Sequence, residues 1–291
     1  APLNIGMIQV RQEADLSNII FESNVDCLGA TFHDEADFQN SIFKQEFVGR
    51  GQAYERDANF QEASFEGECH IPETTFNGSA DFSEATFNSP SRFHGVTFKS
   101  ETAFRNASFN ARVTFKGVTA DSRLRYTDAI FEGEADFRDT TVEWAIFVET
   151  TFQNKVRFDE AEAVAEVDFQ QATFNGEVDC EQATFARANF QNASFYAEAT
   201  FQTSLFKSVK FIETTFHEQV DFSNAVFRCL DAEEAVFRED VSFQAKLSSQ
   251  FIPYTPFQGR ADFSGAIVRG IADFRVLDTD ETVVSDGLAT F

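Results

Sequence analysis

The chain has 291 residues, with 48 acidic and 23 basic side chains and a formal net charge of −25. A nucleic-acid binder needs a positive footprint, so this charge balance argues against that class of protein and fits a soluble protein or one with a basic partner. No segment is long and apolar enough to cross a membrane.

Phenylalanine dominates the large apolar residues, with 38 Phe but only one Trp, one Met and four Tyr. An ordinary mixed core draws on Leu, Ile, Val and Met as well. A chain that relies on one large apolar residue repeats a single packing environment many times. The apolar content is ample for a core and argues against disorder. The composition therefore directs the search to internal repeats.

A triplet of a small residue, a polar residue and Phe recurs along most of the chain, as in Ala36-Asp37-Phe38 and Ala58-Asn59-Phe60. We call the last residue of each triplet the centre. From Leu16 to Phe243, centres follow one another at steps of five or six residues without a break. Residues 1–13 lack the pattern and are expected to form an N-terminal cap.

The residue two before each centre is almost always small or β-branched. In an extended segment, residues two apart point to the same side, so the centre and this residue face inward and the residue between them faces water. A step of five or six fits neither an α-helix nor a long flat strand. The pattern therefore predicts a chain that turns a corner at every step.

The placement of the six-residue steps indicates four sides per coil. Counting centres in fours, these steps occur at only two of the four corners, and at one of them without exception. A coil of about 20 to 22 residues would stack on the next at the strand spacing of roughly 4.8 Å. One interior column should then contain Leu16, Phe38, Phe60, Phe82, Phe104, Tyr126, Phe147, Phe169, Phe190 and Phe211.

These alternating Ala-Asp-Phe and Ala-Thr-Phe triplets resemble the Phe-rich variant of the pentapeptide-repeat family, over roughly Ala14 to Phe274. The resemblance implies an all-β fold, a right-handed quadrilateral β-helix of stacked coils. The departures are the frequent six-residue steps and the weak centres Gly49, Ala120, Ala163 and Ala232. Because Ala120, Val142 and Ala163 follow one another on one wall, we expect a cavity or an inward dent there.

The pattern blurs after Phe243. Residues 245–260 contain Pro253 and Pro256 and predict a distorted coil or bulging loop within a repeat domain that spans residues 14–274. Because Phe263 lies 20 residues after Phe243, we expect a coil with five residues per side there, which places Asp262 on the wall of Asp221. Residues 275–291 are expected to form a C-terminal cap or tail.

No residue pattern indicates catalysis, a metal site or a cofactor site. The four His are scattered, and the four Cys form no CxxC pair. Cys27, Cys69 and Cys180 occupy inward positions, and the sequence neither predicts nor excludes a disulfide between any two of the four Cys. The Asp residues recur with the repeat on two opposite walls, which is typical of a solvated surface rather than of an acid–base pair. Phosphate-binding loops and nucleophile motifs are absent from the sequence.

The sequence favours a non-enzymatic structural or docking protein, a rigid acidic rod that binds another protein or complex. The other two walls carry almost no charge on their outward residues, and the expected partner contacts are Ile20, Ile42 and Ile130 on one of them, or Phe251, Tyr254 and Phe257 on the bulge. The alternative is a DNA mimic that inhibits a type II topoisomerase, as some pentapeptide-repeat proteins do. Such a mimic needs a continuous negative stripe, and here the charged walls are interrupted by Arg92, Arg125, Arg157 and Lys210. The sequence is compatible with a homodimer. The sequence does not select a cellular compartment, since the start at Ala1 fits a processed periplasmic, lumenal or extracellular chain as well as one that has lost its initiator Met.

Overall fold

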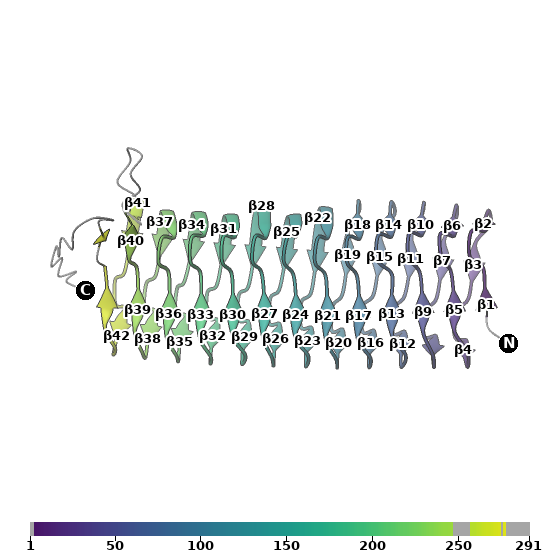
Figure 1. Ribbon diagram of the computed structural model, residues 1–291, viewed down its shortest axis with the longest axis horizontal. Coiled ribbons are helices and arrows are strands. Elements are labelled where there is room, and N and C mark those ends of the chain that lie inside the picture. The colour runs from purple at the N-terminus through teal and green to yellow at the C-terminus, as the bar shows by residue number, and fades with distance from the viewer. Residues whose placement is uncertain (1–2, 247–256, 275, 278–291) are drawn as a thin grey trace.

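The computed structural model describes residues 3–246, 257–274 and 276–277. Within these ranges the chain forms strands, turns and bends, and no helix. Parallel strands stack coil upon coil into a right-handed, four-sided β-solenoid, a straight rod with the N-terminal coil at one end (Figure 1). The structure therefore confirms the predicted fold. We number its walls 1 to 4 in chain order.

Wall 1 is a sheet of 13 parallel strands. Its members are β1 (Leu3–Asn4), β5 (Val25–Asp26), β9 (Phe47–Val48), β13 (Cys69–His70), β17 (Ser91–Arg92), β21 (Val113–Thr114), β24 (Ala135–Asp136), β27 (Val156–Arg157), β30 (Val178–Asp179), β33 (Ala199–Thr200), β36 (Val220–Asp221), β39 (Val241–Ser242) and β43 (Ala272–Asp273).

Walls 2 and 3 begin as separate ladders. Wall 2 starts with β2 (Gln9–Val10), β6 (Thr31–Phe32), β10 (Ala53–Tyr54), β14 (Thr75–Phe76) and β18 (Thr97–Phe98), and wall 3 with β3 (Ala14–Asp15), β7 (Ala36–Asp37), β11 (Ala58–Asn59), β15 (Ala80–Asp81) and β19 (Thr102–Ala103). From there on, single strands run across the corner and serve both walls. These are β22 (Thr119–Arg125), β25 (Thr141–Ile146), β28 (Glu162–Asp168), β31 (Thr184–Asn189), β34 (Leu205–Lys210), β37 (Val226–Asp231) and β41 (Phe257–Asp262).

Wall 4 is a sheet of 12 parallel strands. They are β4 (Ile20–Phe21), β8 (Ile42–Phe43), β12 (Ser64–Phe65), β16 (Thr86–Phe87), β20 (Ser108–Phe109), β23 (Ile130–Phe131), β26 (Thr151–Phe152), β29 (Thr173–Phe174), β32 (Ser194–Phe195), β35 (Thr215–Phe216), β38 (Val236–Phe237) and β42 (Ile267–Val268). A short pair, β40 (Ala245–Lys246) with β44 (Val276–Leu277), completes the described strands.

The core consists of columns of stacked rings. In the predicted interior column, each ring from Phe38 to Phe211 lies 4.7 to 5.0 Å from the next, centroid to centroid, and within 15° of parallel. Rings of different columns meet edge to face, as Phe104 and Phe115 do at 5.5 Å. Both arrangements suit the aromatic quadrupole, and burial of each Phe contributes about 2 to 3 kcal/mol. The column prediction is confirmed.

Two interruptions of the ring columns have different structural consequences. Gly49 leaves room for the inward side chain of Gln52, which is buried and whose Oε1 accepts a hydrogen bond from the hydroxyl of Tyr54 at 3.2 Å. At Val142 and Ala163, where the ring column of wall 2 is interrupted, an apolar cavity of about 20 Å³ lies against Phe185. A volume of that size holds at most one water molecule, and its apolar lining favours an empty cavity. The predicted cavity is confirmed.

The register after Phe243 differs from the prediction. The coil that links Val241 to Ala272 on wall 1 spans 31 residues, whereas the one before it, from Val220 to Val241, spans 21. The extra residues lie before β41, so Phe274, not Phe263, stacks on Phe243, at 4.9 Å. For the same reason Asp262 pairs with Asp231 on wall 3 and not with Asp221 on wall 1.

Candidate docking surface

The corners between walls 1 and 2 and between walls 3 and 4 are tight β-turns. In most of them, the backbone N–H of the third residue after the centre donates to the carbonyl of the centre, as Ala85 does to Phe82 at 3.1 Å. The second residue after the centre has a positive φ, for example 61° at Glu84. That geometry is a type II turn, and it occurs twice in each coil.

The outward residues of walls 1 and 3 cap these turns. Their side-chain oxygen accepts a hydrogen bond from the backbone N–H two residues later, as Asp81 does from Ser83 at 2.8 Å. The same bond occurs at Asp15, Asp26, Asp37, Asn59, Thr114, Asp136, Asp168, Asp179, Asn189, Thr200, Asp221, Asp231 and Asp262. Asp, Asn and Thr are the side chains that make such local turns. The periodic Asp residues are therefore part of the fold's turn chemistry.

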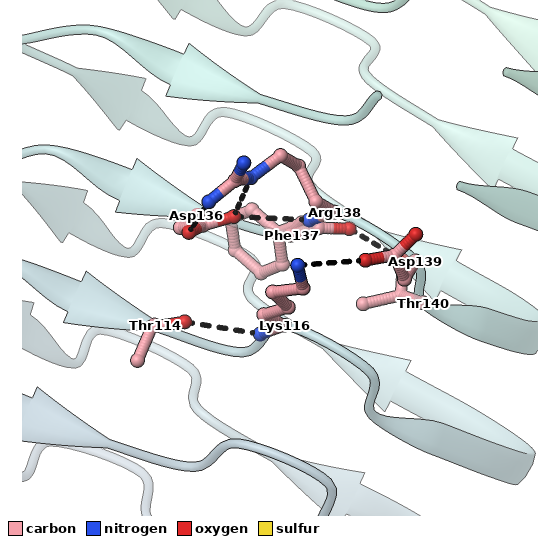
Figure 2. Close-up of polar contacts among 7 residues, drawn as sticks. All are labelled: Thr114, Lys116, Asp136, Phe137, Arg138, Asp139 and Thr140. Carbon is pink, nitrogen blue, oxygen red and sulfur yellow. Dashed lines mark hydrogen bonds and ion pairs between the residues drawn. The ribbon is translucent and has the colours of Figure 1, made fainter. Parts of the chain in front are cut away.

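Asp136 shows how these turns also recruit cations (Figure 2). Its carboxylate accepts hydrogen bonds from the backbone N–H of Arg138 at 3.2 Å and from the guanidinium at 2.9 and 2.8 Å. Burial acts to raise the pKa of Asp136, but the bonds from Arg138 outweigh it and the pKa lies below its ordinary value. One coil earlier, Lys116 forms an ion pair with Asp139 at 3.1 Å.

Asp159 behaves in the opposite way. Burial, together with the hydrogen bond and charge of the neighbouring Asp179, raises the pKa of Asp159 to about 7. Two carboxyl groups in contact cannot both ionise without a large cost, so one of them holds a proton near neutral pH. A polar groove of about 320 Å³ on wall 1 is lined by Asp179 and by residues of the following coils, among them Glu198 and Asp221.

Among the described residues, walls 2 and 4 end in corners without the capping bond, and their outward residues include no Asp. The outward ladder of wall 4 reads Ile20, Ile42, Ser64, Thr86, Ser108, Ile130, Thr151, Thr173, Ser194, Thr215, Val236 and Ile267, and carries no charge along its whole length. Wall 2 carries one acidic side chain in the corresponding ladder, Glu162.

The structure separates the residues expected to contact a partner. Ile20 is 55 % exposed, Ile130 is 40 % exposed and Ile42 is half-buried, and all three lie on wall 4. Phe251 and Tyr254 lie outside the described residues. Phe257 is not on a bulge: its ring stacks on Phe227 at 5.8 Å and packs against the core. Phe257 is therefore removed from the expected contact surface, because the register places it in the ring column of wall 2.

The residues weighed for catalysis occupy structural positions. His70 lies half-buried between Glu46 and Glu68, with ring nitrogens 3.1 and 2.7 Å from their carboxylates. All four Cys are free thiols; burial raises the pKa of Cys27 to about 12 and also raises those of Cys69 and Cys180. In the part of the chain that the structure describes, no three His, Cys, Asp or Glu gather closely enough to hold a metal ion. The same part contains no helix that could span a membrane.

Two features of the surface escaped the sequence-based prediction. The capping role of Asp could be predicted only with the turn geometry, in which the backbone N–H two residues later points back toward the Asp side chain. Tyr196, Ile267 and Ile271, which are 48, 49 and 69 % exposed, were also missed. Tyr196 directly follows a wall 4 centre, at the corner between walls 4 and 1.

The family model for pentapeptide repeats, described as nine copies, matches residues 60–108, 71–119, 93–141 and 139–184. These segments have the same four-sided coils as the rest of the described chain. The matched segment, residues 60–184, therefore consists of pentapeptide repeats.

Two further comparisons add little to the family assignment. Among solved structures, the chain is similar to HetL, a pentapeptide-repeat protein involved in heterocyst differentiation regulation from the cyanobacterium Nostoc sp.. The identity is 13 %, and the similarity covers 97 % of this chain and 92 % of that one, with a TM-score of 0.20, too low to support any inference. No curated protein matches the sequence.

Proposed function

We propose that this protein is a non-enzymatic docking protein, a rigid acidic rod that holds another protein against wall 4. The observation that carries the proposal is the uncharged outward ladder of wall 4, which runs across 12 parallel strands with exposed Ile20, Ile130 and Ile267. Ser, Thr and Ile side chains cost little to desolvate, and a sheet tied by main-chain bonds at every coil loses little freedom on binding. Exposed isoleucines add nothing to strand stacking that Thr would not, and they indicate a contact surface.

The alternative, a topoisomerase inhibitor that mimics DNA, requires a continuous negative stripe. On wall 1 the outward ladder includes Val48, His70, Arg92 and Arg157 among its Asp residues, and on wall 3 it includes Arg125 and Lys210. Each of the two ladders therefore contains side chains of both charge signs and uncharged positions. Since the regular Asp residues cap turns, their presence needs no nucleic-acid mimicry.

The test is an affinity capture from the source cells with matched surface variants. Ser64→Lys with Thr86→Lys places two cations on the third and fourth strands of wall 4, and Val48→Lys with His70→Lys places two on the third and fourth strands of wall 1. We expect the wild type and the wall 1 variant to capture the same proteins and the wall 4 variant to lose them, with unchanged circular dichroism. Capture that survives on the wall 4 variant but disappears on the wall 1 variant would overturn the proposal.

A further inference from the structure

The residue that directly follows each wall 4 centre forms a ladder of its own along the corner between walls 4 and 1. Over most of the rod these side chains pair coil by coil. Lys44 binds Glu66 at 2.7 Å, Asn110 donates to Asn88 at 2.8 Å, and Asn175 donates to Gln153 at 2.7 Å. Each pair satisfies its polar groups with a neighbour one coil away, as cross-strand pairs do.

The last four positions of this ladder break that rule. They are Tyr196, His217, Arg238 and Arg269, which we call the terminal edge ladder. The rings of Tyr196 and His217 stack at 4.2 Å and 23°. Arg238 and Arg269 then follow on adjacent strands, since the register pairs Phe237 with Val268.

The two arginines form a pair of like charges without a carboxylate partner. Both are exposed, and among the residues that the structure describes none presents a carboxylate within 4.0 Å of either guanidinium. The nearby Asp240 accepts a hydrogen bond from the backbone N–H of Ile271 at 2.8 Å. Like charges opposite one another in a ladder destabilise a sheet, so this pair gains nothing from the fold. An anion from outside would relieve the repulsion.

Apolar residues flank Arg269 in the chain, with Ile267 two residues before it and Ile271 two residues after it, and Tyr196 lies two coils before Arg238 at the same corner. Ile267 lies on the outward ladder of wall 4 beside them, and Ile271 and Tyr196 are also exposed. Burial, with the positive charge of Arg238, lowers the pKa of His217, so the imidazole adds a planar neutral ring rather than a third cation near neutral pH. Tyr and Arg are among the residues that dominate the energetics of protein interfaces.

We propose that the terminal edge ladder, with Ile267, binds an acidic polypeptide segment that also carries apolar side chains. This inference rests on the proposed docking function and names the chemistry of the partner at the C-terminal end of wall 4. Planar guanidinium groups bind carboxylates in a bidentate manner, and Ile267 and Tyr196 offer apolar contact beside them. Two cations on a rod of net charge −25 are too few for a long polyanion such as nucleic acid, which the remaining surface would repel.

The test uses a fluorescein-labelled peptide of alternating Glu and Leu as the probe and measures its binding by fluorescence anisotropy. The first variant is Arg238→Gln with Arg269→Gln. The matched control is Lys207→Gln with Arg228→Gln, which removes two exposed cations from adjacent coils at the corner between walls 2 and 3, where the register pairs Phe206 with Phe227.

We expect the first variant to weaken peptide binding at least tenfold and the control to change it less than twofold. Binding to the wild type should also shift the ring resonances of His217 in an NMR titration and leave those of His33 unchanged. Equal losses in the two variants would mean unspecific charge attraction, and no binding to the wild type would mean that no such site exists; either result overturns the inference. The variant with Ser64→Lys and Thr86→Lys should still bind the peptide, so failure of the wall 4 proposal and failure of this inference are distinguishable.

Discussion

All four walls are built from the same repeat and bury the same kind of ring column. Regular Asp residues nevertheless occur only on walls 1 and 3, and not on walls 2 and 4. The difference begins at the corners. Walls 1 and 3 lead into type II turns whose N–H groups need an acceptor, and Asp136 or Asp81 supplies it. Walls 2 and 4 lead into corners without that bond, where Thr86 and Ile130 suffice. The comparison teaches that regularly placed charge on a repeat protein can follow from turn chemistry rather than from recognition.

The largest effect is expected on the inward side, which both kinds of wall share. Phe131 lies between Phe109 and Phe152, with both rings at 4.8 Å, so Phe131→Ala should cost about 3 to 5 kcal/mol of unfolding free energy. Val142→Ala, beside the existing cavity, should cost about 1 kcal/mol, because few contacts remain to be lost there. Chemical denaturation of both variants measures the difference, and equal costs would show that the columns are not independent.

The next effect separates the two kinds of wall directly. Asp81→Ala removes the acceptor for the N–H of Ser83 and should cost about 1 to 2 kcal/mol, whereas Asp81→Asn should keep most of the stability, as Asn59 does in the coil before. Thr86→Ala on wall 4 is the matched control and should change stability by less than about 0.5 kcal/mol. The turn-capping account fails if Asp81→Ala proves as neutral as Thr86→Ala in denaturant titrations.

A smaller effect concerns the pH dependence of stability at the carboxyl pair on wall 1. The folded pKa of Asp159 is raised to about 7, so its protonated form is favoured by the fold and stability declines as pH rises from about 4 through 7. Asp159→Asn should remove this decline and stabilise the protein at pH 8 by an amount on the order of 1 kcal/mol, after allowance for solvent screening. Thermal unfolding at pH 5 and pH 8 measures it, and an unchanged pH slope in the variant would contradict the assignment.

The capping carboxylates should respond to acid in the opposite direction. Hydrogen bonds from Ser264 and Arg260 lower the folded pKa of Asp262 to about 2, and those from Ser17 lower that of Asp15. A lowered folded pKa contributes stability that is present above about pH 4 and is lost as pH falls further. Asp15→Asn should therefore make the loss of stability between pH 4 and pH 2 shallower by a small amount, measurable by acid titration of circular dichroism.

Most of the fold could be predicted from the sequence because one signal repeats in every coil. The spacing of centres such as Phe38, Phe60 and Phe82 defines the inward column, and the six-residue steps define the corners. The register failed at Phe263, because the additional residues before β41 allow two alignments that spacing alone cannot separate. The surface was less predictable: the capping bonds of Asp depend on turn geometry, and the contact of Phe257 with Phe227 depends on the same insertion.

The most direct test of the docking account is photo-crosslinking of the native complex in the source cells. A benzoylphenylalanine side chain replaces Ile130 on wall 4 in one variant and the exposed Arg92 on wall 1 in the other. The account predicts that the probe at Ile130 attaches to a partner protein, which mass spectrometry identifies, and that the probe at Arg92 does not. Crosslinks from Arg92 with none from Ile130 would contradict it and return the Asp-bearing walls to the role of recognition surface.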